Sequence, residues 1–152
     1  MINHIDVSSV LRRTVCDLYS NLVTRPTGAA VRTEIENLLS AWRGPSLTVI
    51  AFSQVNLLVS SCADEVVAKL LLRLEGGAPP VDAYFLLRGV REDHLDAIEA
   101  ALERYDLALV MQDDDGGLLL VGTVNDAQRR AWQALREMGK CAVDDLATAI
   151  GE

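Results

Sequence analysis

Residues 46–74 join a predicted buried strand to a predicted helix, and they constrain the fold more than any other part of the chain. The segment 47–52 reads LTVIAF, an almost unbroken apolar run with three β-branched residues. Such a run is typical of a strand that is covered on both faces. From Ala63 onward, apolar residues recur every three or four positions, which is the helical period. This stretch therefore predicts a core strand followed by a helix that begins near Ser61.

The segments on either side predict further helices and strands. Apolar periodicity predicts two helices before the core strand, separated by a turn at residues 24–28. The first is expected to be capped by Ser8 or Ser9 and to end near Ser20. A second apolar strand at residues 83–87 precedes a helix that opens near Glu92 and ends near Tyr105. This order of elements predicts an α/β fold in which parallel strands are joined by right-handed crossovers. Residues 2–6 fit either a strand or a fraying chain end.

Residues 105–152 predict a β-hairpin and a pair of helices. The two hairpin strands flank the sequence DDDGG at residues 113–117, whose composition is typical of a tight turn. Its carboxylates lack the ligand spacing of an EF-hand loop, so we expect no metal there. The helices at about 125–139 and 143–150 resemble the first two helices of a helix-turn-helix, as in a partial winged helix. We therefore expect an α/β domain over residues 1–104, with residues 105–152 packed on it.

The start of the helix near Ser61 offers two interpretations. Ser60 or Ser61 can cap the helix, with Asp64 and Glu65 in the first turn complementing its positive end. Alternatively, a hydroxyl at this strand-to-helix junction lies on the surface and could be phosphorylated there, because unpaired backbone amides receive the phosphate.

The predicted turn before the second helix contains another candidate site. Arg25, Thr27 and Gly28 stand at a helix start, where such residues either cradle an anion or simply form the turn.

The charge and cysteine content exclude several classes of protein. The formal net charge is −8, from 22 acidic and 14 basic residues, which argues against general affinity for nucleic acid or an anionic membrane. Cys16, Cys62 and Cys141 are odd in number and form no CxxC pair. With no signal-peptide pattern and no apolar run near 18 residues in length, they predict a protein of the reducing cytoplasm without disulfides.

The sequence does not predict an enzyme. A serine or cysteine nucleophile needs a base, and His4 and His94 belong to no recognisable catalytic or metal-binding pattern. A glycine-rich phosphate loop and a dinucleotide fingerprint are both missing from the sequence, so we expect no cofactor.

A motif in the central stretch resembles a known family. Residues 55–65, VNLLVSSCADE, and the upstream residues 22–28, LVTRPTG, are similar to the corresponding segments of bacterial STAS-like domains. The resemblance covers roughly residues 8–104. It departs from the family pattern at Ala51, where the family strand usually has Asp, and at Val59, where the anti-sigma-factor antagonists have Asp before the serine.

The resemblance implies a small sheet with flanking helices and a regulatory function. In the related anti-sigma-factor antagonists, a serine at this junction is phosphorylated by an ATPase-kinase of the histidine-kinase-like fold. By position, Ser60 or Ser61 would be the switch. The implied partner-binding residues are Cys62, Asp64, Glu65 and Lys69, on a docking helix that spans residues 63–74.

Two functions follow as hypotheses. The first is a non-enzymatic regulatory module that binds a protein partner, such as a histidine-kinase-like ATPase. The alternative is a transcriptional regulator, which would bind DNA only if a recognition helix follows residue 152. Apolar segments such as residues 118–121 fit either an internal sheet or a homodimer seam, and we expect no membrane contact.

Overall fold

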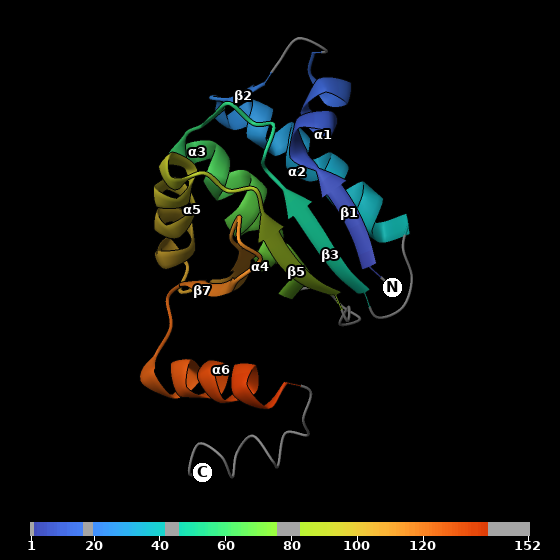
Figure 1. Cartoon of the computed structure of the whole chain (residues 1–152). Helices are drawn as coiled ribbons and strands as arrows, with labels where there is room; N and C mark the ends of the chain where they lie inside the picture. The colour runs from blue at the N-terminus through green and yellow to red at the C-terminus, as the bar shows by residue number, and fades with distance from the viewer. Residues whose placement is uncertain (1, 17–19, 42–45, 76–82, 140–152) are drawn as a thin grey trace. The chain divides into compact units, whose positions relative to one another are not determined.

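The computed structural model describes residues 2–16, 20–41, 46–75 and 83–139. The chain divides into two compact units, Met1–Gly122 and Thr123–Glu152. The first unit contains a five-stranded sheet with the strand order β1-β3-β5-β6-β7 (Figure 1). Helices connect its parallel strands, so the predicted α/β class is confirmed.

The sheet is parallel except for its last strand. Residues 2–6 form a strand that pairs with β3 along its whole length, and β5 pairs with β3 on the other side. β7 runs antiparallel to β6. The strands are β1 (Ile2–Asp6), β3 (Ser46–Ala51), β5 (Ala83–Arg88), β6 (Ala108–Gln112) and β7 (Leu118–Gly122).

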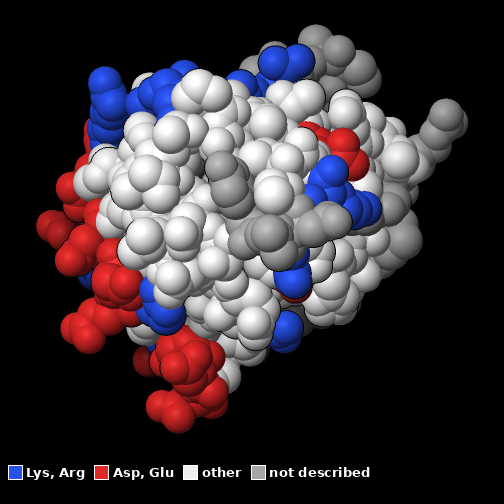
Figure 2. All heavy atoms as spheres, turned by 90° about the horizontal axis from the view of Figure 1, so that it is seen from above, with Lys and Arg blue, Asp and Glu red and all other residues white. Residues whose placement is uncertain are grey.

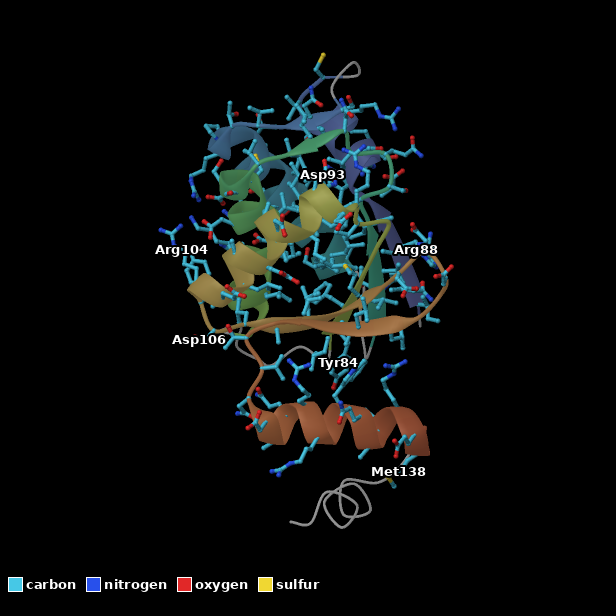
Figure 3. All side chains as sticks on the ribbon, turned by 60° about the vertical axis from the view of Figure 1, so that its left-hand side comes forward. Tyr84, Arg88, Asp93, Arg104, Asp106 and Met138 are labelled. Atoms are coloured by element: carbon cyan, nitrogen blue, oxygen red, sulfur yellow. The ribbon has the colours of Figure 1, made fainter. Side chains whose placement is uncertain are left out.

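The main helices lie on one face of the sheet (Figure 1). Right-handed crossovers between successive neighbouring strands place every connecting helix on the same side. Tyr84 lies on the other face and points away from α5 (Figure 3). The helices are α1 (Val7–Thr14), α2 (Arg25–Ala41), the continuous helix formed by α3 (Ser60–Ala63), η1 (Asp64–Ala68) and α4 (Lys69–Glu75), and α5 (Glu92–Arg104).

The continuous helix of residues 60–75 is the centre of the helical layer. It packs against α2 on one side and α5 on the other, and residues 62–68 are all buried. Val66, Val67 and Leu70 face the sheet residues Ile50 and Leu87 across a narrow gap. The prediction of a helix beginning near Ser61 and running to Leu74 is therefore confirmed.

The N-terminal part differs from its prediction in two ways. The first helix, expected to be capped by Ser8 or Ser9 and to end near Ser20, is capped by Asp6 and ends at Thr14. Asp6 Oδ1 accepts a hydrogen bond from the Ser8 amide at 3.1 Å, because Asp6 directly precedes the first helical residue. A two-stranded parallel ribbon, β2 (Asn21–Leu22) with β4 (Leu57–Leu58), was not predicted.

The C-terminal hairpin belongs to the sheet of the first unit. The Asp113 carboxylate accepts hydrogen bonds from the amides of Asp115 and Gly117, so it closes the turn, as predicted. Because β6 and β7 complete the sheet, the boundary expected after residue 104 lies instead between Gly122 and Thr123.

The second unit contains α6 (Asp126–Met138), which begins with a reciprocal capping box between Asn125 and Gln128. The helix predicted at residues 143–150 lies outside the described residues. Across the described parts of both units, no helix combines the length and the apolar character needed to span a bilayer.

Candidate functional site at the start of α2 and α3

The β2–β4 ribbon brings the starts of α2 and α3 together. The Val59 amide donates to the Leu22 carbonyl at 3.0 Å, and the Asn56 amide donates to the Ser20 carbonyl at 2.7 Å. The chain then enters α2 after Thr24 and α3 after Val59. Both helix starts therefore lie beside the β2–β4 ribbon.

Ser60 and Ser61 are the first two residues of α3. Ser60 is exposed and Ser61 is half-buried. The N-cap residue is Val59, which provides no side-chain hydrogen bond, so the prediction that a serine caps this helix is wrong. Both serines lie one or two positions inside the helix, where backbone amides have no partner within the helix.

Cys62 lies in the contact between α3 and α2. Its side chain is fully buried, and Sγ donates a hydrogen bond to the Thr24 carbonyl at 3.0 Å. A Cβ on Gly28 would lie 3.1 Å from Cys62 Cα and 3.2 Å from Glu65 Cβ. Gly28 therefore allows the two helices to approach closely. This packing role differs from the predicted role of Gly28 in an anion cradle.

Burial of Cys62 leads to a prediction about its reactivity. Removal from water raises the pKa of the Cys62 thiol, which lowers the fraction of reactive thiolate. In a Cys16→Ser/Cys141→Ser variant at pH 8, we expect an aromatic disulfide reagent to modify the native protein at least about a hundredfold more slowly than the urea-unfolded protein. Absorbance of the released thiol measures both rates, and similar rates would show that Cys62 is accessible.

Arg25 connects the start of α2 to two buried carboxylates. Its Nη1 donates to Asp64 Oδ2 at 2.7 Å and to Glu65 Oε1 at 2.8 Å. The Arg25 side chain is 42% exposed, whereas each carboxylate side chain is only 4% exposed. The hydrogen bonds to Asp64 and Glu65 raise the pKa of Arg25. Arg25 was predicted to bind an anion. In the structure, the anions that it binds are two carboxylates of the same chain.

Glu65 receives two further cations. Lys69 Nζ lies 2.9 Å from its Oε1, and Arg32 Nε donates to its Oε2 at 3.2 Å. Burial alone would raise the pKa of Glu65, but the hydrogen bonds from Lys69 and Arg25 outweigh this effect and lower it. Arg32 also pairs with Glu36, one turn further along α2. Glu65 is therefore ionised at neutral pH and connects the two helices.

Asp64 is less completely paired than Glu65. Its Oδ1 is buried and has no hydrogen-bond partner among the described residues. The backbone is also irregular here, because residues 64–68 form a π-helical turn in which the Lys69 amide bonds the Asp64 carbonyl. Such turns frequently occur at functional sites.

His94 lies at a separate position on α5. It is buried, and its Nε2 hydrogen-bonds the Asn56 carbonyl at 3.1 Å and contacts an Arg91 nitrogen at 3.0 Å. Within the described residues, these contacts attach α5 to the loop before β4.

The structure places the predicted site residues in three environments. Cys62, Asp64 and Glu65 are buried, so they cannot present side chains to a partner, and most of the expected docking helix is covered by α2 and α5. Lys69 is partly exposed. Thr27 pairs with the Thr24 hydroxyl at 2.8 Å beside a surface pocket of about 250 Å³ that Asn21 and Val23 also line.

Arg32 and Glu36 were missed by the sequence analysis. Arg32 is seven residues after Arg25, a spacing that places both on one side of a helix and was a detectable signal.

Among the described residues, no group of three or more His, Cys, Asp or Glu residues is arranged to hold a metal ion.

Comparisons with known proteins found no matching family model, curated protein or solved structure.

Proposed function

We propose that this chain is a non-enzymatic, STAS-like regulatory module that binds a protein partner and is switched by phosphorylation at Ser60 or Ser61. The observation that carries the proposal is the exposure of Ser60, beside the half-buried Ser61, at the uncapped start of a helix. A phosphate at this position is stabilised by unpaired amides and by the positive end of the helix dipole. The resemblance of residues 55–65 to STAS-like domains supports the same function.

The partner we propose is a histidine-kinase-like ATPase that docks on the outer face of the β2–β4 ribbon. Leu22 and Leu58 are buried, whereas Leu57 in β4 and Val23, which directly follows β2, are exposed. Val23 is 47% exposed, and Leu57, which lies three residues before Ser60, is 49% exposed. Figure 2 looks onto this end of the molecule and shows a largely uncharged centre, with acidic side chains gathered on the left. An apolar contact beside the serines fits a partner that must reach them.

Phosphorylation tests the switch directly. The chain should be incubated with ATP and the ATPase-kinase encoded nearest to it, and its intact mass measured. We expect the mass of one added phosphate, which is lost when both serines are replaced by alanine. No added phosphate and no complex with the ATPase would remove this proposed function.

A substitution on the ribbon tests the docking surface. We expect Leu57→Glu to weaken binding of the ATPase at least about tenfold, because an unpaired carboxylate in an apolar interface costs more than 1.4 kcal/mol. Leu119→Glu is the matched control, since Leu119 is also an exposed strand leucine but belongs to β7. Calorimetry measures both affinities, and equal weakening by the two substitutions would exclude the ribbon as the docking surface.

A further inference from the structure

Helical spacing places Ser61, rather than Ser60, on the side of the helix that carries both partners of Arg25, Asp64 and Glu65. Helical residues three and four positions apart are neighbours on one side of the helix. Asp64 and Glu65 stand at these two positions after Ser61, whereas Ser60 has only Asp64 of this pair as such a neighbour. The half-buried state of Ser61 agrees with this placement, because Glu65 on the same side of the helix is bonded by Arg25 and Arg32 of α2.

Asp64 and Glu65 depend on Arg25 for their hydrogen bonds to different extents. Glu65 retains Lys69 and Arg32 if Arg25 moves away. Asp64 retains no hydrogen-bond partner among the described residues, since its Oδ1 is unpaired and its Oδ2 is bonded to Arg25. The Arg25 side chain is 42% exposed, so it can be reached by a new anion at the surface, whereas both carboxylates are buried. The contact between α2 and α3 is therefore sensitive to any new anion that attracts Arg25.

We propose that phosphorylation of Ser61, and not of Ser60, loosens the contact between α2 and α3 by drawing the Arg25 guanidinium away from Asp64 and Glu65. This inference rests on the proposed function, which assigns phosphorylation to the serine pair. The kinase transfers the γ-phosphoryl group of ATP: a bond forms from Ser61 Oγ to phosphorus, the bond to the β-phosphate oxygen breaks, ADP leaves and the hydroxyl proton is released.

Two effects of the new phosphate act in the same direction. It adds up to two negative charges about one helical turn from Asp64 and Glu65, which repel it. It also accepts a bidentate bond from arginine, which is among the strongest hydrogen-bonded ion pairs in proteins. Asp64 is then buried without a counter-charge, a costly state that favours separation of the helices.

Cys62 reports the separation, because it is buried between the helices and its Sγ bonds the Thr24 carbonyl. Phosphoserine should be installed during synthesis at position 61 or at position 60, in a background with Cys16→Ser and Cys141→Ser. We expect phosphoserine at 61 to accelerate modification of Cys62 by an aromatic disulfide at least about tenfold over the unmodified chain, and phosphoserine at 60 less than about twofold.

Arg25→Gln provides the second half of the test. We expect this substitution to expose Cys62 without phosphate, after which phosphoserine at 61 adds less than about a twofold increase. If far-UV circular dichroism shows that phosphoserine at 61 unfolds the chain, Ser61→Asp and Ser60→Asp replace the two modified chains, with the same order of rates expected. The inference would be overturned if phosphoserine at 61 left the rate of Cys62 modification unchanged, or if phosphoserine at 60 and at 61 accelerated it equally. Failure of the ATPase to phosphorylate the chain would count against the proposed function alone, because this experiment uses no kinase.

Discussion

Replacing Glu65 with alanine is expected to lower the free energy of unfolding by about 3 kcal/mol at pH 7, the largest loss we expect from a single charged side chain. Glu65 is buried and bonds Arg25, Arg32 and Lys69, so its removal leaves the facing positive charges of two helices without their shared carboxylate. Urea unfolding followed by circular dichroism measures the loss. Glu103→Ala is the matched control on the exposed side of α5, with an expected change within about 0.5 kcal/mol. Equal effects of the two substitutions would show that Glu65 does not connect the helices.

The effect of Glu65→Ala should also depend on pH. The pKa of Glu65 is lower in the folded chain than its usual value, so the unfolded chain takes up a proton first as the pH falls. The stabilisation is therefore fully present above the unfolded pKa of about 4.3 and is lost as the pH falls through the lower folded value. The stability difference between the native chain and the variant should be constant from about pH 7 to 5.5 and should shrink below about pH 4.3. A difference that grows on acidification would contradict the ionised state of Glu65.

Replacing Gly28 with valine is expected to lower the free energy of unfolding by about 3 kcal/mol, because the added atoms enter the contact between α2 and α3. Even the first of these atoms would lie 3.1 Å from the backbone of Cys62, which cannot move without shifting α3. Gly28→Ala should cost less, since alanine favours a helix over glycine by about 1 kcal/mol and offsets part of the overpacking. Urea unfolding measures both variants. Asn37→Val, at an exposed position of α2, controls for the helix propensity of valine. A Gly28→Val chain as stable as the control would show that the helices do not approach closely here.

Elements with a strong local pattern were predicted from the sequence. The core strand, the helix after it, the strand at residues 83–88 and the hairpin turn at Asp113 all agree with the structure. Their signals are apolar periodicity and turn chemistry, which nearby residues determine. The short ribbon strands β2 and β4 have no such signal, because two residues define no period and their pairing joins positions far apart in the sequence.

The candidate site was predicted in its residues but not in its arrangement. Arg25 and the pair Asp64 and Glu65 were identified separately, and they are 39 and 40 residues apart. Charged residues are usually exposed, so the sequence placed both carboxylates on the surface. Burial of these side chains depends on cations supplied by α2, which only tertiary packing brings into contact.

A double-mutant cycle between Arg25 and Asp64 tests the contact on which the candidate site depends. Urea unfolding at pH 7 should be measured for Arg25→Ala, Asp64→Ala, the double variant and the native chain. Since Arg25 is the hydrogen-bond partner of Asp64 at 2.7 Å, we expect the double variant to lose clearly less stability than the sum of the two single losses. Losses that add within experimental error would contradict the contact between α2 and the continuous helix of residues 60–75 through these side chains.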